Sequence, residues 1–161
     1  MIDLQLRQEE AKLAYLAVAY HLGRPGSELD PTTKQPVEHG LAEIARALQP
    51  QLVTAIATMS LSDYQLSRLF SGMLGSITEL KAYPMLELRG PDDGGGRRST
   101  VPGFDRSLRH LFPEVEEDAE AALSVAERML MLKRQIDRKL ADAPAAPEQA
   151  PPKRPWWRLG R

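Results

Sequence analysis

Apolar residues recur at helical spacing near the start of the chain. Over residues 3–22 they return every three or four positions, and alanines widen the apolar arc. The stripe comprises Leu6, Leu13, Leu16, Ala17 and Tyr20, flanked by Ala14, Val18 and Leu22. We predict a first helix here that is central to the fold. Gly23 and Pro25 should end it, and the turn residues that follow predict a loop up to Pro36.

The next apolar stripe predicts a second helical region over residues 37–59. It consists of Leu41, Ile44, Leu48, Leu52, Ala55, Ile56 and Met59. Pro50 lies inside this region. Because an interior proline removes a hydrogen bond and clashes with the preceding turn, we expect a kink or a break after Gln49.

A third helix is predicted over residues 63–82. It begins with a capping box, in which Ser62 caps the first turn and Gln65 reaches back. Small residues crowd its middle, and two of them are Gly72 and Gly75. Two helical glycines cost about 2 kcal/mol of helix propensity. We expect a close helix crossing to offset this cost, with close approach to a ligand as the alternative.

The C-terminal part of the domain is predicted to contain a long flexible loop over residues 84–104 and a short helix over residues 105–111. A last helix should run from Pro113 to Ala141. Its acidic first turns and basic last turns complement the helix dipole. It carries a narrow apolar seam of Val125, Met129, Leu132, Ile136 and Leu140, which should dock on other helices or on a second copy.

These patterns predict an all-α fold and indicate no strand. We expect an irregular bundle of four to five helices over residues 1–141. Residues 142–161 should form a disordered tail, with a linker rich in Pro and Ala that ends in a basic Trp-Trp motif.

Composition narrows the function classes. The 161 residues include no cysteine, which excludes disulfides, thiolate metal sites and a cysteine nucleophile. The net charge of −1 excludes a uniformly basic nucleic-acid coat. Basic charge gathers in residues 89–109 and in the tail. The acidic opening and the short apolar runs predict neither a signal peptide nor a membrane span, so we expect a cytoplasmic protein.

No residue pattern predicts catalysis, a metal or a cofactor. His39 and Glu43 are spaced to share one helix face, but a metal needs three or four converging ligands. The glycine-rich stretch 94–100 lacks the lysine and the spacing of a phosphate-binding loop. An enzyme would need two or three of His21, Glu38, His39, Glu43 and His110 to converge in a pocket.

The tail carries the strongest functional signal. Both tryptophans of the chain lie there among cations, although exposed tryptophan is costly. The predicted partner-binding residues are Lys153, Arg154, Trp156, Trp157, Arg158 and Leu159. Such a segment suits a groove in a protein partner, an anionic membrane surface or unpaired bases. Docking on the protein's own helices is a fourth alternative.

The sequence therefore predicts a non-enzymatic helical adaptor or scaffold. It would bind a protein partner through its helical body and its tail, and it could form a homo-oligomer through the last helix. One alternative is a nucleic-acid-associated accessory protein that uses the tail and an anion-binding loop over residues 89–109. The cations of that loop are Arg89, Arg97, Arg98, Arg106 and Arg109. A second alternative is peripheral association with a membrane surface through the tail.

Overall fold

The computed structural model describes residues 1–29, 32–87, 99, 101 and 103–141. Over these residues the protein is mostly helical and has one small sheet of two strands. The elements follow in the order β1 (Ile2–Arg7), α1 (Gln8–Gly23), α2 (Leu41–Leu48), the 3-10 helix η1 (Gln49–Val53), β2 (Ile56–Leu61), α3 (Asp63–Glu87), α4 (Phe104–Leu111), α5 (Glu114–Glu117) and α6 (Ala121–Ala141). The described part thus has six α-helices, where four to five were predicted. A mainly helical fold is confirmed, and the prediction of no strand is wrong.

The sheet joins the start of the chain to its middle. β1 and β2 pair antiparallel, with Gln5 opposite Thr58 and Arg7 opposite Ile56. Every second side chain is buried, which is the period of a strand covered on one face. The predicted helix over 3–22 is therefore wrong at residues 3–7. The predicted helical region over 37–59 is wrong at residues 37–40 and 54–59, of which 56–59 belong to β2. Each strand is only six residues long and lies beside a helical stretch, so its apolar residues also fit the neighbouring helical spacing.

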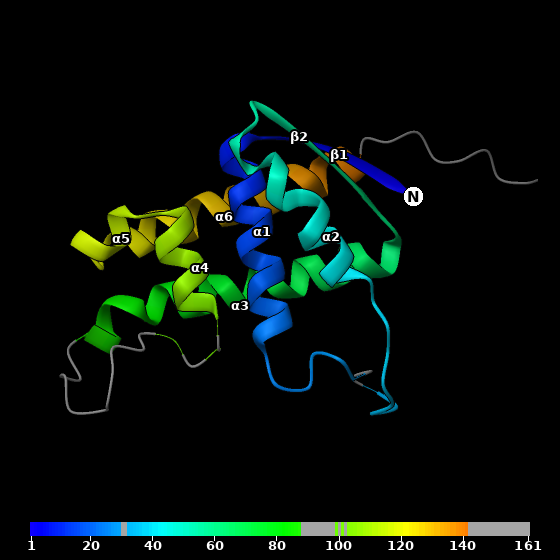
Figure 1. The fold of residues 1–161 in the computed structure, drawn as a ribbon, viewed down its shortest axis with the longest axis horizontal. Helices are drawn as coiled ribbons and strands as arrows, with labels where there is room; N and C mark the ends of the chain where they lie inside the picture. Colours follow the sequence, from blue (N-terminus) through cyan, green and yellow to red (C-terminus); the bar gives the residue numbers. More distant parts are fainter. Residues whose placement is uncertain (30–31, 88–98, 100, 102, 142–161) are drawn as a thin grey trace, which may run out of the picture.

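α1 is the central helix, as predicted. It contacts α2, α3, α4 and α6, and Figure 1 shows it running between α2 on one side and α4 on the other. Its buried residues lie on every side of the helix, because small alanines alternate with larger apolar side chains. They include Ala11, Leu13, Ala14, Leu16, Ala17 and Val18. The helix ends at Gly23, as the glycine and proline signals predicted.

The glycines of α3 allow the close helix crossing that the sequence predicted. A Cβ atom at Gly72 would lie 2.4 Å from the carbonyl oxygen of Ala17 on α1. A Cβ atom at Gly75 would lie 2.1 Å from Cε1 of Tyr20, also on α1. Both distances are far below van der Waals contact. α1 can therefore pack directly against α3 only because both positions are glycine, and this packing offsets the helix propensity that the glycines lose.

Proline and capping signals mark several of the observed boundaries. α2 ends at Leu48, and Pro50 opens the 3-10 helix that follows, so the predicted break is confirmed. The capping box at the start of α3 is also confirmed. The main-chain N–H of Ser62 donates to Gln65 Oε1 at 2.9 Å, and the N–H of Gln65 donates to Ser62 Oγ at 3.2 Å.

The predicted long loop starts too early. α3 continues through Pro84 to Glu87, because a proline near a helix end removes few hydrogen bonds. Most of the remaining predicted loop, residues 88–98, 100 and 102, lies outside the described residues, as does the tail. α4 begins at Phe104, one residue before its predicted start.

The predicted helix from Pro113 to Ala141 is two helices. α5 ends at Glu117, and Asp118 adopts an extended backbone. The Asp118 side chain accepts a hydrogen bond from the N–H of Glu120 at 2.9 Å, which satisfies a main-chain donor just before α6. The predicted seam of α6 is buried from Val125 to Ile136. It packs against α3, so this face serves the protein's own core.

Candidate functional site

The predicted partner-binding residues of the tail, 153–159, lie outside the described residues. So do Arg89, Arg97 and Arg98 of the predicted anion-binding loop. Of that loop, the structure places Arg106 and Arg109 on α4. Arg106 is exposed, whereas Arg109 is half-buried.

Arg109 is held by the protein itself. Its guanidinium Nη2 lies 3.0 Å from Asp105 Oδ2, and its Nε donates to Asp105 Oδ1 at 3.2 Å. The hydroxyl of the fully buried Tyr83 on α3 donates to the same Oδ1 at 2.6 Å. Burial, and then the Asp105 carboxylate, raise the pKa of Tyr83. The cluster ties α4 to α3, which leaves Arg109 poorly placed to bind an external anion.

Two histidines that are far apart in the sequence meet in the fold. The rings of His21 and His39 make an edge-to-face contact with centroids 5.2 Å apart. His21 is 1% exposed, and neither of its ring nitrogens has a hydrogen-bond partner. Burial, and then the nearby charges of His39, Arg68 and Arg24, lower the pKa of His21 to about 4. His21 is therefore a neutral buried ring at physiological pH.

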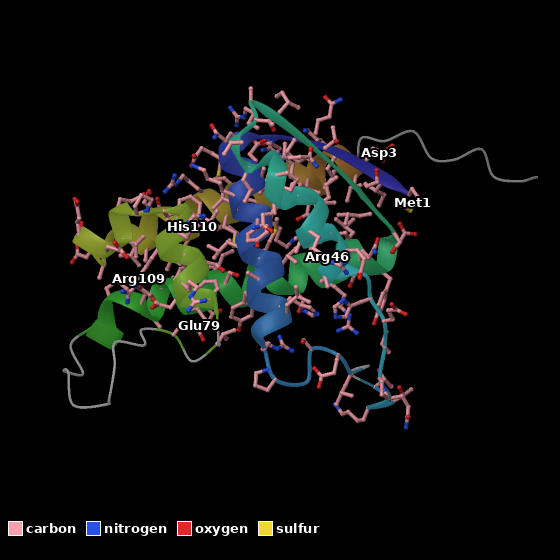
Figure 2. All side chains as sticks on the ribbon, in the orientation of Figure 1. Met1, Asp3, Arg46, Glu79, Arg109 and His110 are labelled. Carbon is pink, nitrogen blue, oxygen red and sulfur yellow. The ribbon has the colours of Figure 1, made fainter. Side chains whose placement is uncertain are left out.

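The sequence suggested that His39 and Glu43 share one helix face, but in the structure they do not. It precedes α2, and its Nδ1 accepts a hydrogen bond from the N–H of Leu41 at 3.2 Å. Neither His21 nor His39 lines the open groove beside Phe70 and Leu74 of α3 or the one beside Met131 and Arg138 of α6. His110 is exposed on α4, and Figure 2 shows it on the opposite side of α1 from Arg46 of α2. The part of the chain that the structure describes contains no group of three or more metal-binding side chains.

An open groove of about 560 Å³ runs along the outer face of α3. Its described lining combines two cations, three hydroxyl side chains and two large apolar side chains. These residues, together with one glycine, are Arg24, Ser67, Phe70, Ser71, Leu74, Gly75, Thr78 and Lys133. The predicted helix crossing accounts for Gly72 and Gly75, whereas Ser67 and Ser71 line this groove, which the sequence did not indicate.

The groove has an apolar centre and a cationic rim. Leu74 is 52% exposed, although it lies in the middle of a helix. The Lys133 ammonium lies 4.5 Å from the centroid of the Phe70 ring and 2.7 Å from Asp137 Oδ2. Arg24 is exposed at the end of α1. No carboxylate is among the described lining residues, although Asp137 beside the groove pairs with Lys133.

Comparisons of the chain with protein-family models, with curated proteins and with solved structures found no significant match. Within the described residues, each helix is too short or too polar to cross a lipid bilayer.

Proposed function

We propose that the protein is a non-enzymatic adaptor or scaffold of the cytoplasm that binds a protein partner. Its helical body would hold one segment of that partner in the groove on α3. The residues around Trp156 and Trp157 in the tail would bind a second surface. The observation that carries the proposal is the exposed apolar centre of the α3 groove between Arg24 and Lys133.

The chemistry of the groove favours an acidic amphipathic helix as its ligand. Such a helix presents apolar anchors at positions i, i+3, i+4 and i+7, which suit a long open groove. Phe70 and Leu74 provide the apolar contact surface, and the exposed Arg24 can receive a carboxylate at one edge, while Lys133 at the other is shared with Asp137. Because long-range attraction between opposite charges accelerates encounter, binding should weaken as the salt concentration rises.

A designed peptide tests the groove directly. The probe is an amphipathic helix of about four turns, with leucines at the anchor positions and glutamates elsewhere. A matched peptide carries lysines in place of the glutamates. Binding is followed by amide chemical shifts of the isotopically labelled protein. We expect the acidic peptide to shift Ser71, Leu74 and Thr78, and the basic peptide to leave them unchanged.

A pair of substitutions supplies the control. Leu74→Asp places a carboxylate in the groove, and we expect it to weaken binding of the acidic peptide at least about fivefold, since a buried anchor is worth more than about 1 kcal/mol. Leu123→Asp changes a leucine that is 41% exposed on α6, outside the groove, and should leave binding unchanged. Equal affinity of both peptides, or an equal effect of both substitutions, would contradict the proposal.

Tryptophan emission tests the tail, because both tryptophans of the chain lie there. Water-exposed emission that neither anionic vesicles nor single-stranded oligonucleotide changes supports a protein partner. A shift with vesicles alone would favour the membrane-surface alternative, and quenching by oligonucleotide alone would favour the nucleic-acid alternative. Emission that is already blue-shifted and indifferent to both additions would mean that the tail docks on the protein itself.

A further inference from the structure

The two free edges of the sheet differ. At the outer edge of β2, the side-chain amide of Gln51 forms hydrogen bonds with both main-chain groups of Thr58. The Thr58 N–H donates to Gln51 Oε1 at 2.8 Å, and Gln51 Nε2 donates to the Thr58 carbonyl at 3.2 Å. The Thr54 hydroxyl donates to the carbonyl of Ile56 at 3.0 Å. Side chains from η1 and the following turn therefore occupy both main-chain groups of Thr58 and the carbonyl of Ile56, which hinders further strand pairing at the middle of this edge.

The orientation of Thr58 also fixes which groups of β1 face outward. In an antiparallel pair, directly opposite residues either exchange two hydrogen bonds or point their main-chain groups away from each other, in alternation. The main-chain groups of Thr58 point away from β1, so those of its partner Gln5 point away from β2. By the same alternation, the main-chain groups of Asp3 and Arg7 also point away from β2. Consistently, the outward N–H of Arg7 donates to Glu10 Oε2 at 2.8 Å.

Asp3 and Gln5 therefore present an open strand edge. Their outward N–H and carbonyl groups have no hydrogen-bond partner among the described residues. β2 and α1 are the described elements that pack substantially against β1, and Asp3 and Gln5 are exposed. Figures 1 and 2 show β1 at the rim of the molecule, with Asp3 near the marked N-terminus.

We propose that β1 pairs antiparallel with β1 of a second copy of this chain. Asp3 lies opposite Gln5 of the partner subunit, and Leu4 lies opposite Leu4 of the partner subunit on the twofold axis. Asp3 and Gln5 of the partner subunit exchange two main-chain hydrogen bonds, as do Gln5 and Asp3 of the partner subunit, which uses every open group of Asp3 and Gln5 in both copies. The result is a continuous four-stranded sheet in the order β2, β1, β1 and β2.

The strand's own chemistry selects a second copy in this register. Asp3 and Gln5 flank Leu4 symmetrically and each offers one outward N–H and one outward carbonyl, so two copies satisfy each other's open groups in this register. Each Arg7 guanidinium stays with its own Glu10, at 2.9 Å. Centring the pair on Asp3 would set two carboxylates against each other. Centring it on Gln5 would require the N–H of Arg7, which Glu10 already holds. A slip by one residue would bring inward-facing groups to the edge.

Sedimentation velocity over a range of concentrations tests the dimer. Gln5→Pro removes one outward N–H at the proposed interface without touching the β1–β2 hydrogen bonds. Ser60→Pro is the control at the other edge, because Ser60 is opposite Asp3 and its N–H faces outward there. Because Ser60→Pro also removes the hydroxyl that donates to Asp3 Oδ1, Ser60→Ala is measured beside it to separate the two effects. We expect the wild type and Ser60→Pro to dimerise and Gln5→Pro to stay monomeric with an unchanged circular dichroism spectrum.

Disulfide cross-linking between two single-cysteine variants tests the register of the proposed strand pair. Both cysteines replace exposed residues. The chain has no cysteine, and residues opposite each other in a hydrogen-bonded pair have Cα atoms about 5.5 Å apart, within the range of about 4.4–6.8 Å that a disulfide spans. We expect oxidation to cross-link an Asp3→Cys protein with a Gln5→Cys protein, and neither variant with itself.

Three results would overturn the proposal. The first is a wild type that stays monomeric at every concentration. The second is self-linking of Gln5→Cys without the mixed product, which would mean another register. The third is a dimer that survives Gln5→Pro and is lost on Met131→Glu, a change on the outer face of α6 where Met131 is 57% exposed. That result would place the interface on the last helix.

Discussion

The buried histidine of α1 should make the protein acid-labile in a defined pH window. His21 has no hydrogen-bond partner for either ring nitrogen, and Arg24, Arg68 and His39 all face it as present or potential cations. A proton on this ring would be a buried charge without a counterion. The folded protein therefore resists protonation, whereas the unfolded chain accepts the proton near the ordinary pKa of 6.5.

The size of the effect follows from the two pKa values. The pKa of His21 is 6.5 when unfolded and about 4 when folded. Above pH 6.5 the ring is neutral in both states and has no effect on stability. Between the two values the unfolded state binds more protons, so stability falls as the pH falls. Since one pKa unit corresponds to about 1.4 kcal/mol, the loss is about 2 kcal/mol at pH 5 and about 3 kcal/mol below pH 4.

Urea unfolding at pH 7.5 and pH 5.0 measures this loss in a range where few carboxylates titrate. We expect the free energy of unfolding of the wild type to fall by about 2 kcal/mol. His21→Met fills the site with an adaptable apolar side chain and should lose less than about 0.5 kcal/mol. His110→Gln removes an exposed histidine and should behave as the wild type does. A wild type with equal stability at both pH values, or a His21→Met protein with the full loss, would refute the reasoning.

Three further substitutions should lower the free energy of unfolding in urea. Gly75→Ala drives a methyl group into the ring of Tyr20 and should cost about 2 kcal/mol, as overpacking does; a stabilised variant would mean that the helices separate easily. Tyr83→Phe removes the hydroxyl that donates to Asp105 and should cost about 1–2 kcal/mol, and an unchanged midpoint would show that the cluster adds nothing. Ser62→Ala removes the cap of α3 and should cost about 1 kcal/mol, with no loss arguing against the capping box.

The sequence alone determined the features that depend on neighbouring residues. Gly23 ends α1, Pro50 ends α2 and Ser62 caps α3, because each acts on the backbone within one helical turn. The seam of α6 was also readable, since an amphipathic helix shows its buried face in its own periodicity. The crossing at Gly72 was predicted because helical glycine is costly without a packing reason.

The tertiary structure alone decided features that join distant segments. β1 and β2 are strands because each satisfies the other's main-chain groups, and no short window contains both partners. The α3 groove exists because Arg24, which follows the end of α1, and Lys133 of α6 both come to lie beside α3. His21 became a buried neutral ring because α3 and the residues before α2 close over the end of α1. Burial depends on what covers a side chain, and the chain supplies that cover only when it folds.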